Sequence, residues 1–107
     1  MEIKQHEIIL VNLTPTIGSE IQKTRPCVVI SPNEMNKHLR TVVIAPMTTS
    51  SKSYPTRVEM KHNGTIGQVA LDQIRTIDKQ RVIKVLGRIT KPEIKELKSI
   101  LKETYID

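Results

Sequence analysis

The sequence contains few aromatic residues and little cysteine. Its 107 residues include no Trp, no Phe, two Tyr and one Cys. A single thiol excludes an internal disulfide framework and any multi-thiolate metal site within one subunit. The shortage of aromatic rings argues against a nucleic-acid interface that depends on base stacking. The core must therefore be aliphatic, built from Ile, Val, Leu and Met.

Long apolar segments are also missing. No apolar run approaches the length of a membrane span, and the N-terminus lacks the apolar core of a signal peptide. We therefore expect a cytoplasmic protein that does not associate with membranes. The length favours one domain over residues 1–107. Cys27 precedes the apolar run 28–30, which predicts a buried, structural thiol.

The charge is unbalanced toward positive. Lys and Arg number 17 against 11 Asp and Glu, which gives a formal net charge of +6 and a pI near 9.7. A basic surface favours polyanions or acidic protein partners through long-range attraction. Solubility alone is a competing explanation of a net charge of this size on a small domain. Charge by itself therefore leaves nucleic-acid binding open.

Short β-branched runs separated by turn residues predict a mainly β domain with one helix. We expect strands over residues 8–13, 26–31, 41–46, 56–60, 66–71 and 82–86, and a turn or short helix over 32–37. Thr90 and Glu93 fit a capping box, and Ile94, Leu97 and Leu101 follow at helical spacing. Many short strands at close spacing suggest a small barrel closed off by a C-terminal helix.

Two loops are rich in phosphate-binding groups. Arg25 stands before Pro26, which biases Arg25 toward extended geometry and holds its guanidinium at the mouth of a buried strand. The segment 47–55 follows another buried strand and carries five Ser and Thr hydroxyls, which can bind phosphate and sugar oxygens. Each loop alone is weak evidence. Together with the positive charge they predict a site for a phosphate-bearing ligand.

Three segments carry a resemblance to a known family. They read LTPTIGSE followed by TRP, then PMTTSSKSYP, then LDQIRTID. In this order and spacing the chain resembles the MazF/PemK/Kid family of bacterial toxin endoribonucleases, also called mRNA interferases. The resemblance implies an SH3-like β-barrel with added helices, usually assembled as a homodimer.

The resemblance also implies an activity and partners. Members are toxins of type II toxin–antitoxin pairs that inhibit growth by cutting single-stranded RNA at specific sequences, without metal or cofactor. The 2′-hydroxyl attacks its own phosphate and leaves a 2′,3′-cyclic phosphate and a 5′-hydroxyl. Their antitoxins bring an acidic, partly disordered segment that covers the RNA groove, and such segments fold on binding.

Site residues follow from the same resemblance. Arg25 and Thr48 match the two positions used at the scissile phosphate, with Arg25 stabilising charge and Thr48 bonding a phosphate oxygen. The positions expected to bind RNA are Ser19, Glu20, Thr49, Lys52, Asp72 and Gln73. One branch of the family instead uses a histidine at position 19 and an arginine at position 70. This chain has Ser19 and Ala70 there, so that acid–base scheme does not carry over.

Several alternatives remain open. Arg75 could form a structural ion pair with Asp72 or Asp78, or lie outside the site. His6, His38 and His62 match no catalytic position of the family, and no His, Cys and carboxylate cluster has metal-ligand spacing. The competing function is a non-catalytic barrel that binds nucleic acid or a protein target, as a related toxin family does with a topoisomerase. The general acid, the general base and the RNA recognition motif stay unassigned.

Overall fold

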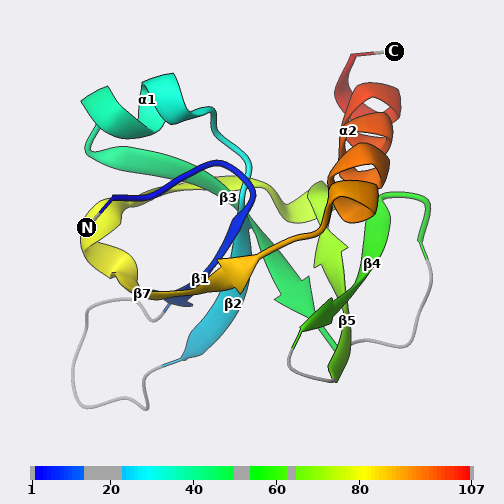
Figure 1. The fold of residues 1–107 in the computed structure, drawn as a ribbon, viewed down its shortest axis with the longest axis horizontal. Coiled ribbons are helices and arrows are strands. Elements are labelled where there is room, and N and C mark those ends of the chain that lie inside the picture. Colours follow the sequence, from blue (N-terminus) through cyan, green and yellow to red (C-terminus); the bar gives the residue numbers. More distant parts are fainter. Residues whose placement is uncertain (1, 14–22, 50–53, 63–64, 107) are drawn as a thin grey trace.

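The chain folds into one antiparallel sheet of seven strands with a helix packed beside it (Figure 1). The computed structural model describes residues 2–13, 23–49, 54–62 and 65–106. The strands are β1 (Glu7–Asn12), β2 (Thr24–Val29), β3 (Thr41–Thr48), β4 (Arg57–His62), β5 (Thr65–Ala70), β6 (Arg75–Asp78) and β7 (Val82–Arg88). The helices are α1 (Asn33–His38), α2 (Lys91–Tyr105) and the 3₁₀ turns η1 (Leu71–Gln73) and η2 (Lys79–Arg81).

The strand order is β4-β5-β3-β2-β1-β7, and β6 pairs with β3. Because β3 is eight residues long, its two halves take different neighbours on one edge. Met47 and Thr48 pair with β5, whereas residues 41–44 pair with β6. The end strands β4 and β7 do not pair with each other in the described part of the chain, so the sheet is open. A mainly β, barrel-like fold with a C-terminal helix is confirmed.

The sheet buries apolar side chains on both faces. Ile8, Val28 and Ala45 belong to one apolar cluster, which also contains Leu97 of α2. Their chain neighbours Ile9, Val29 and Ile44 belong to a second cluster on the opposite face. Successive side chains of a strand point to opposite faces, so a strand covered on both sides is apolar throughout. This explains the continuous apolar runs of the central strands.

Helix α2 begins as the sequence predicts. Thr90 caps it by accepting a hydrogen bond from the Glu93 backbone N–H at 3.3 Å, while Glu93 Oε1 accepts from the Thr90 N–H at 2.8 Å. The other carboxylate oxygen of Glu93 accepts from the Lys61 N–H at 3.3 Å. The capping box therefore also ties the start of α2 to β4. Leu97 is 1% exposed and anchors the apolar stripe in the core.

The predicted elements are confirmed, with strand ends shifted by one or two residues. The 32–37 segment forms the short helix α1, whose Asn36 is buried and accepts the Ser31 hydroxyl at 2.5 Å. Strand β6 was not predicted. Only Ile77 of its four residues is buried, so the local pattern carries little strand signal. Pairing with the edge of β3 creates this strand.

Candidate functional site

Arg25 and Thr48 come together at the adjoining ends of β2 and β3. The β2–β3 ladder pairs Cys27 with Pro46, and the same register continued by two residues sets Arg25 opposite Thr48. Both residues line a hollow of about 210 Å³. The complete described lining is Thr24, Arg25, Pro26, Met47, Thr48 and Thr49. The two polar loops noticed in the sequence therefore build one site.

Pro26 explains how the arginine is held. Its ring restricts Arg25 to extended backbone, and Arg25 is indeed part of strand β2, paired with Val11 of β1. Arg25 is half-buried, because strands lie on both sides of it. A guanidinium fixed in this way presents several donors in one plane, which suits a phosphate.

Cys27 lies beside Arg25 on the same face of β2. It is fully buried, which raises the pKa of its thiol to about 12, while Arg25 and Arg75 act in the opposite direction. Both guanidinium groups therefore lie near enough to this thiol to act on its pKa. The prediction of a buried Cys27 is confirmed.

Asp72 is engaged by protein groups. Arg57 Nε and the Thr56 hydroxyl each donate to Asp72 Oδ1 at 2.9 Å, and Arg57 Nη2 donates to Oδ2 at 3.4 Å. The hydrogen bond from Arg57 is the main reason that the pKa of Asp72 is lowered. Arg57 also lies over the Tyr54 ring, 5.0 Å from its centre. The carboxylate thus fixes the start of β4 against η1.

The sequence interpretation did not predict that Thr56 and Arg57 hold Asp72. Their position could have revealed this contact. Both residues directly follow Pro55, at the start of a strand that faces the Asp72 segment. Turn η1 is held further by the Tyr105 hydroxyl, which donates to the Leu71 carbonyl. Helix α2 therefore braces the segment that carries Asp72 and Gln73.

The other predicted RNA-binding residues are distributed around these two groups. Thr49 is exposed and lines the hollow with Arg25 and Thr48. Gln73 is exposed at the end of η1 and does not belong to the described lining. Ser19, Glu20 and Lys52 lie outside the described residues.

The possible ion pair of Arg75 is absent from the described part of the chain. Asp72 is occupied by Arg57, and Asp78 Oδ1 accepts the Gln80 N–H at 2.8 Å to cap η2. Arg75 instead stands opposite Ile44 and is exposed. Of the two alternatives for Arg75, a pair with Asp72 or Asp78 is therefore wrong.

Neither His6 nor His38 lines the hollow that contains Arg25 and Thr48. His6 precedes β1, is 7% exposed and has a φ of 71°. Burial, with Lys98 and Arg88 nearby, lowers its pKa. His38 ends α1 and lies 3.4 Å from Glu34. Within the described ranges no group of three His, Cys, Asp or Glu is arranged to hold a metal ion. None of the described helices has the length and apolar character of a membrane span.

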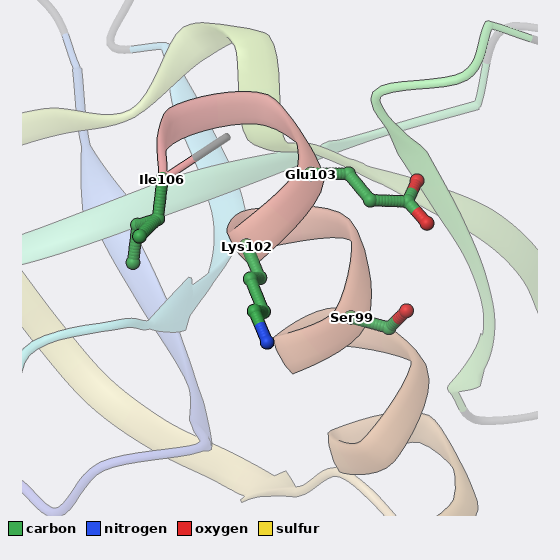
Figure 2. Close-up of a pocket in the computed structure, with 4 residues that line it drawn as sticks. All are labelled: Ser99, Lys102, Glu103 and Ile106. Atoms are coloured by element: carbon green, nitrogen blue, oxygen red, sulfur yellow. The ribbon is translucent and has the colours of Figure 1, made fainter.

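A larger hollow, of about 450 Å³, lies along the last turns of α2. Ser99, Lys102, Glu103 and Ile106 line it (Figure 2). Figure 2 shows Lys102 and Glu103 pointing in different directions, so their charges do not converge on a common point. Its polar groups come from one exposed helix surface, which gives it little of the character of a binding site.

Comparison with known proteins agrees with this geometry. A model of the PemK-like, MazF-like toxins of type II toxin–antitoxin systems matches residues 4–105. The endoribonuclease MazF of Staphylococcus saprophyticus is 30% identical over 105 residues, covering 92% of this chain and 88% of that protein.

Solved structures give the same result. MazF of Deinococcus radiodurans superposes with a TM-score of 0.82 at 25% identity, covering 100% of this chain and 99% of the other. A MazE–MazF structure from the same organism gives a TM-score of 0.83 at 26% identity, covering 97% and 96% of the two chains. The protein therefore belongs to the family of PemK-like, MazF-like toxins of type II toxin–antitoxin systems.

Proposed function

We propose that this toxin is a sequence-specific endoribonuclease that cuts single-stranded RNA in the cytoplasm and thereby inhibits growth. The observation that carries the proposal is that Arg25 and Thr48 line one hollow at the ends of β2 and β3. The endoribonuclease MazF of Staphylococcus saprophyticus, matched over most of both chains, supports it.

RNA supplies both the nucleophile and the leaving group of the reaction, and water accepts and supplies the two protons that move. The 2′-hydroxyl oxygen attacks the adjacent phosphorus, the bond to the 5′-oxygen breaks, and a 2′,3′-cyclic phosphate and a 5′-hydroxyl result. One proton leaves the 2′-hydroxyl and one reaches the departing oxygen. Negative charge builds on the phosphate oxygens between these events. Groups placed in advance where this charge develops stabilise the transition state.

Arg25 is suited to that task because its guanidinium stays protonated and is held by the extended backbone of β2. Thr48 stands opposite and offers a hydroxyl that donates to a second phosphate oxygen. A guanidinium is a poor proton donor near neutral pH, so Arg25 acts mainly through its charge. Asp72 contributes indirectly, by holding η1, which also carries Gln73, against the start of β4.

We further propose that the active form is a homodimer regulated by an acidic antitoxin. The structure of MazE with MazF from Deinococcus radiodurans supports an antitoxin partner. The net charge of +6 suits an acidic, partly disordered segment that folds on binding. Such a segment would compete with RNA for the surface around Arg25.

The test uses purified protein, a long defined RNA and EDTA. We expect discrete cuts that leave 5′-hydroxyl ends, and a loss of at least about 10²-fold in rate for Arg25→Ala. Arg40→Ala is the matched control, because Arg40 is exposed next to the opposite end of β3. Intact RNA with a clear gel shift for the wild type would contradict catalysis and favour the non-catalytic binding module.

A further inference from the structure

A row of four polar side chains crosses the sheet beside the proposed cleavage site. Thr48 of β3 pairs directly with Gln68 of β5, and Gln68 pairs in turn with Glu59 of β4. Arg25 continues the row on the other side of Thr48. Residues directly opposite each other in an antiparallel pair project from the same face as near neighbours. Figure 1 shows the three strands β3, β5 and β4 side by side.

The row stands on the face turned away from the α2 core. Val58, Met60 and Val69 flank Glu59 and Gln68 along their strands and are buried in the cluster that contains Leu97. Because side chains alternate, Glu59 and Gln68 project from the opposite face. Strand spacing places Glu59 about 10 Å from Thr48, two strands away. The row therefore leads outward from the cleavage site across β5 to β4.

Gln68 carries an unsatisfied hydrogen-bond acceptor. Its Oε1 atom is buried and has no partner among the described residues, although the residue as a whole is half-buried. Buried polar atoms without a partner are uncommon and unfavourable, and they call for an explanation. The terminal torsion of glutamine is soft, so a small rotation turns this oxygen toward a ligand lying on the row. A hydrogen-bond donor on the ligand would then satisfy this oxygen.

Glu59 is a free carboxylate at the end of the row. It is exposed, and its side chain makes no ion pair or hydrogen bond within the described part of the chain. A carboxylate repels phosphate, so it cannot help to bind the RNA backbone. The edges of bases, in contrast, carry N–H donors that Glu and Gln side chains accept. The row thus changes from phosphate-binding groups at Arg25 and Thr48 to base-reading groups at Gln68 and Glu59.

We propose that Gln68 and Glu59 read one base of the RNA whose phosphate is bound at Arg25 and Thr48. Two acceptors side by side match a base edge with two adjacent N–H donors, which guanine provides through N1–H and its amino group, whereas uracil provides only N3–H. This inference rests on the proposed function, because it assumes RNA at the hollow. A base that lacks the second donor leaves one of the two acceptors unpaired, and sites that hydrogen-bond their substrate in this way discriminate strongly.

The experiment compares four proteins on a pool of single-stranded RNA with randomised sequence: wild type, Glu59→Gln, Gln68→Val and Glu96→Gln. Fragment ends give the preference at every position around the cut. We expect Glu59→Gln and Gln68→Val to lose about 10- to 100-fold of discrimination at one shared position. Glu96→Gln removes the same charge from an exposed site on α2, and it should keep the wild-type preference.

A stability measurement separates recognition from a structural role. Gln68→Val removes the unsatisfied acceptor and installs a residue that favours strands, so its midpoint of thermal unfolding should equal or exceed that of the wild type. Unchanged preferences at all positions in both variants would overturn the proposal. If a variant does not cut, binding to the same pool carrying 2′-deoxyribose takes its place. Loss of one base preference in binding supports the proposal, and wild-type preference in binding overturns it.

The two proposals fail in different ways. A wild type that cuts no RNA contradicts the nuclease function, whatever the variants do. A wild type that cuts at a defined sequence, with variants that cut at the same sequence, leaves the nuclease intact and removes Gln68 and Glu59 from recognition.

Discussion

Arg25 and Thr48 stand opposite each other at the ends of two neighbouring antiparallel strands and line the same hollow. Twenty-three positions separate them in the sequence, and the loop 30–40 with helix α1 lies between their strands. Both belong to strands of one sheet, two residues beyond the last pair of the β2–β3 ladder, which limits how far their separation can vary. A phosphate in the hollow would therefore meet a charge and a hydroxyl already in place, which is the arrangement that lowers a barrier most effectively.

Two substitutions of Thr48 distinguish the contribution of its hydroxyl from that of its shape. We expect Thr48→Val to slow RNA cleavage by about 10²-fold, because the isosteric side chain cannot donate to a phosphate oxygen. Thr48→Ser retains the hydroxyl and should keep most of the rate. Single-turnover rates on one defined RNA measure this effect. Equal cleavage rates for the Thr48→Val and Thr48→Ser variants would mean that Thr48 contributes through its packing alone.

The Asp72–Arg57 pair should contribute to stability in a pH-dependent way. The pKa of Asp72 is lowered in the folded state, so its contribution is present above the ordinary pKa and is lost as the pH falls through the folded value. The carboxylate is partly exposed, and we expect Asp72→Asn to cost about 1 kcal/mol or less at neutral pH. Urea unfolding should show this difference narrowing below about pH 4. If the difference in the free energy of unfolding between the wild type and Asp72→Asn does not change with pH, the ion pair is not its source.

His6 should make the protein less stable in mild acid. Its pKa is lowered by burial and by Lys98 and Arg88, so the unfolded chain binds more protons than the folded one. Stability is therefore lost as the pH falls through about 6.5, the ordinary histidine pKa, toward the folded value. His6→Asn should flatten this dependence, because asparagine tolerates the positive φ and does not titrate.

The matched control for this experiment is His38→Asn, at an exposed position in α1. It should keep the dependence of the wild type between pH 8 and pH 5.5, roughly the interval in which histidine titrates. If both variants behave like the wild type, His6 is not the titrating group.

The thiol of Cys27 should be unreactive in the native protein. Burial raises its pKa to about 12, and the thiolate is the reactive form. Alkylating reagents should label it at a negligible rate in buffer and completely in denaturant. Rapid labelling without denaturant would mean that β2 opens locally, since Cys27 is fully buried in the native sheet.

The cap of α2 is a further test of the fold. Thr90→Ala removes the acceptor of the Glu93 N–H and should lower the free energy of unfolding by about 1 kcal/mol. Thr90→Ser keeps the hydroxyl and is expected to lie close to the wild type. Because Glu93 also accepts from Lys61, loosening the cap should increase hydrogen exchange at the Lys61 amide. Unchanged hydrogen-exchange protection of the Lys61 amide would mean that the cap does not stabilise the sheet.

The sequence alone determined which residues form strands and which face of the helix is buried. Alternation and β-branching identified six of the seven strands, and the capping box located the start of α2. It also placed Arg25 directly before one strand and Thr48 in the hydroxyl-rich loop after another, and the family resemblance singled out both residues. These features depend on neighbours within a few positions, so local pattern is enough to reveal them.

Only the tertiary structure decided which of these residues meet. The register of β2 on β3 brings Arg25 to Thr48, and that of β3, β5 and β4 aligns Thr48, Gln68 and Glu59. Arg57 forms an ion pair with Asp72, and Arg75 stays exposed. Strand β6 forms because it pairs with the edge of β3. Register is set by the packing of both faces over long sequence separations, and a slip of one residue would turn every side chain to the other face. For that reason the sequence could name candidate residues, whereas only the fold shows which of them are neighbours.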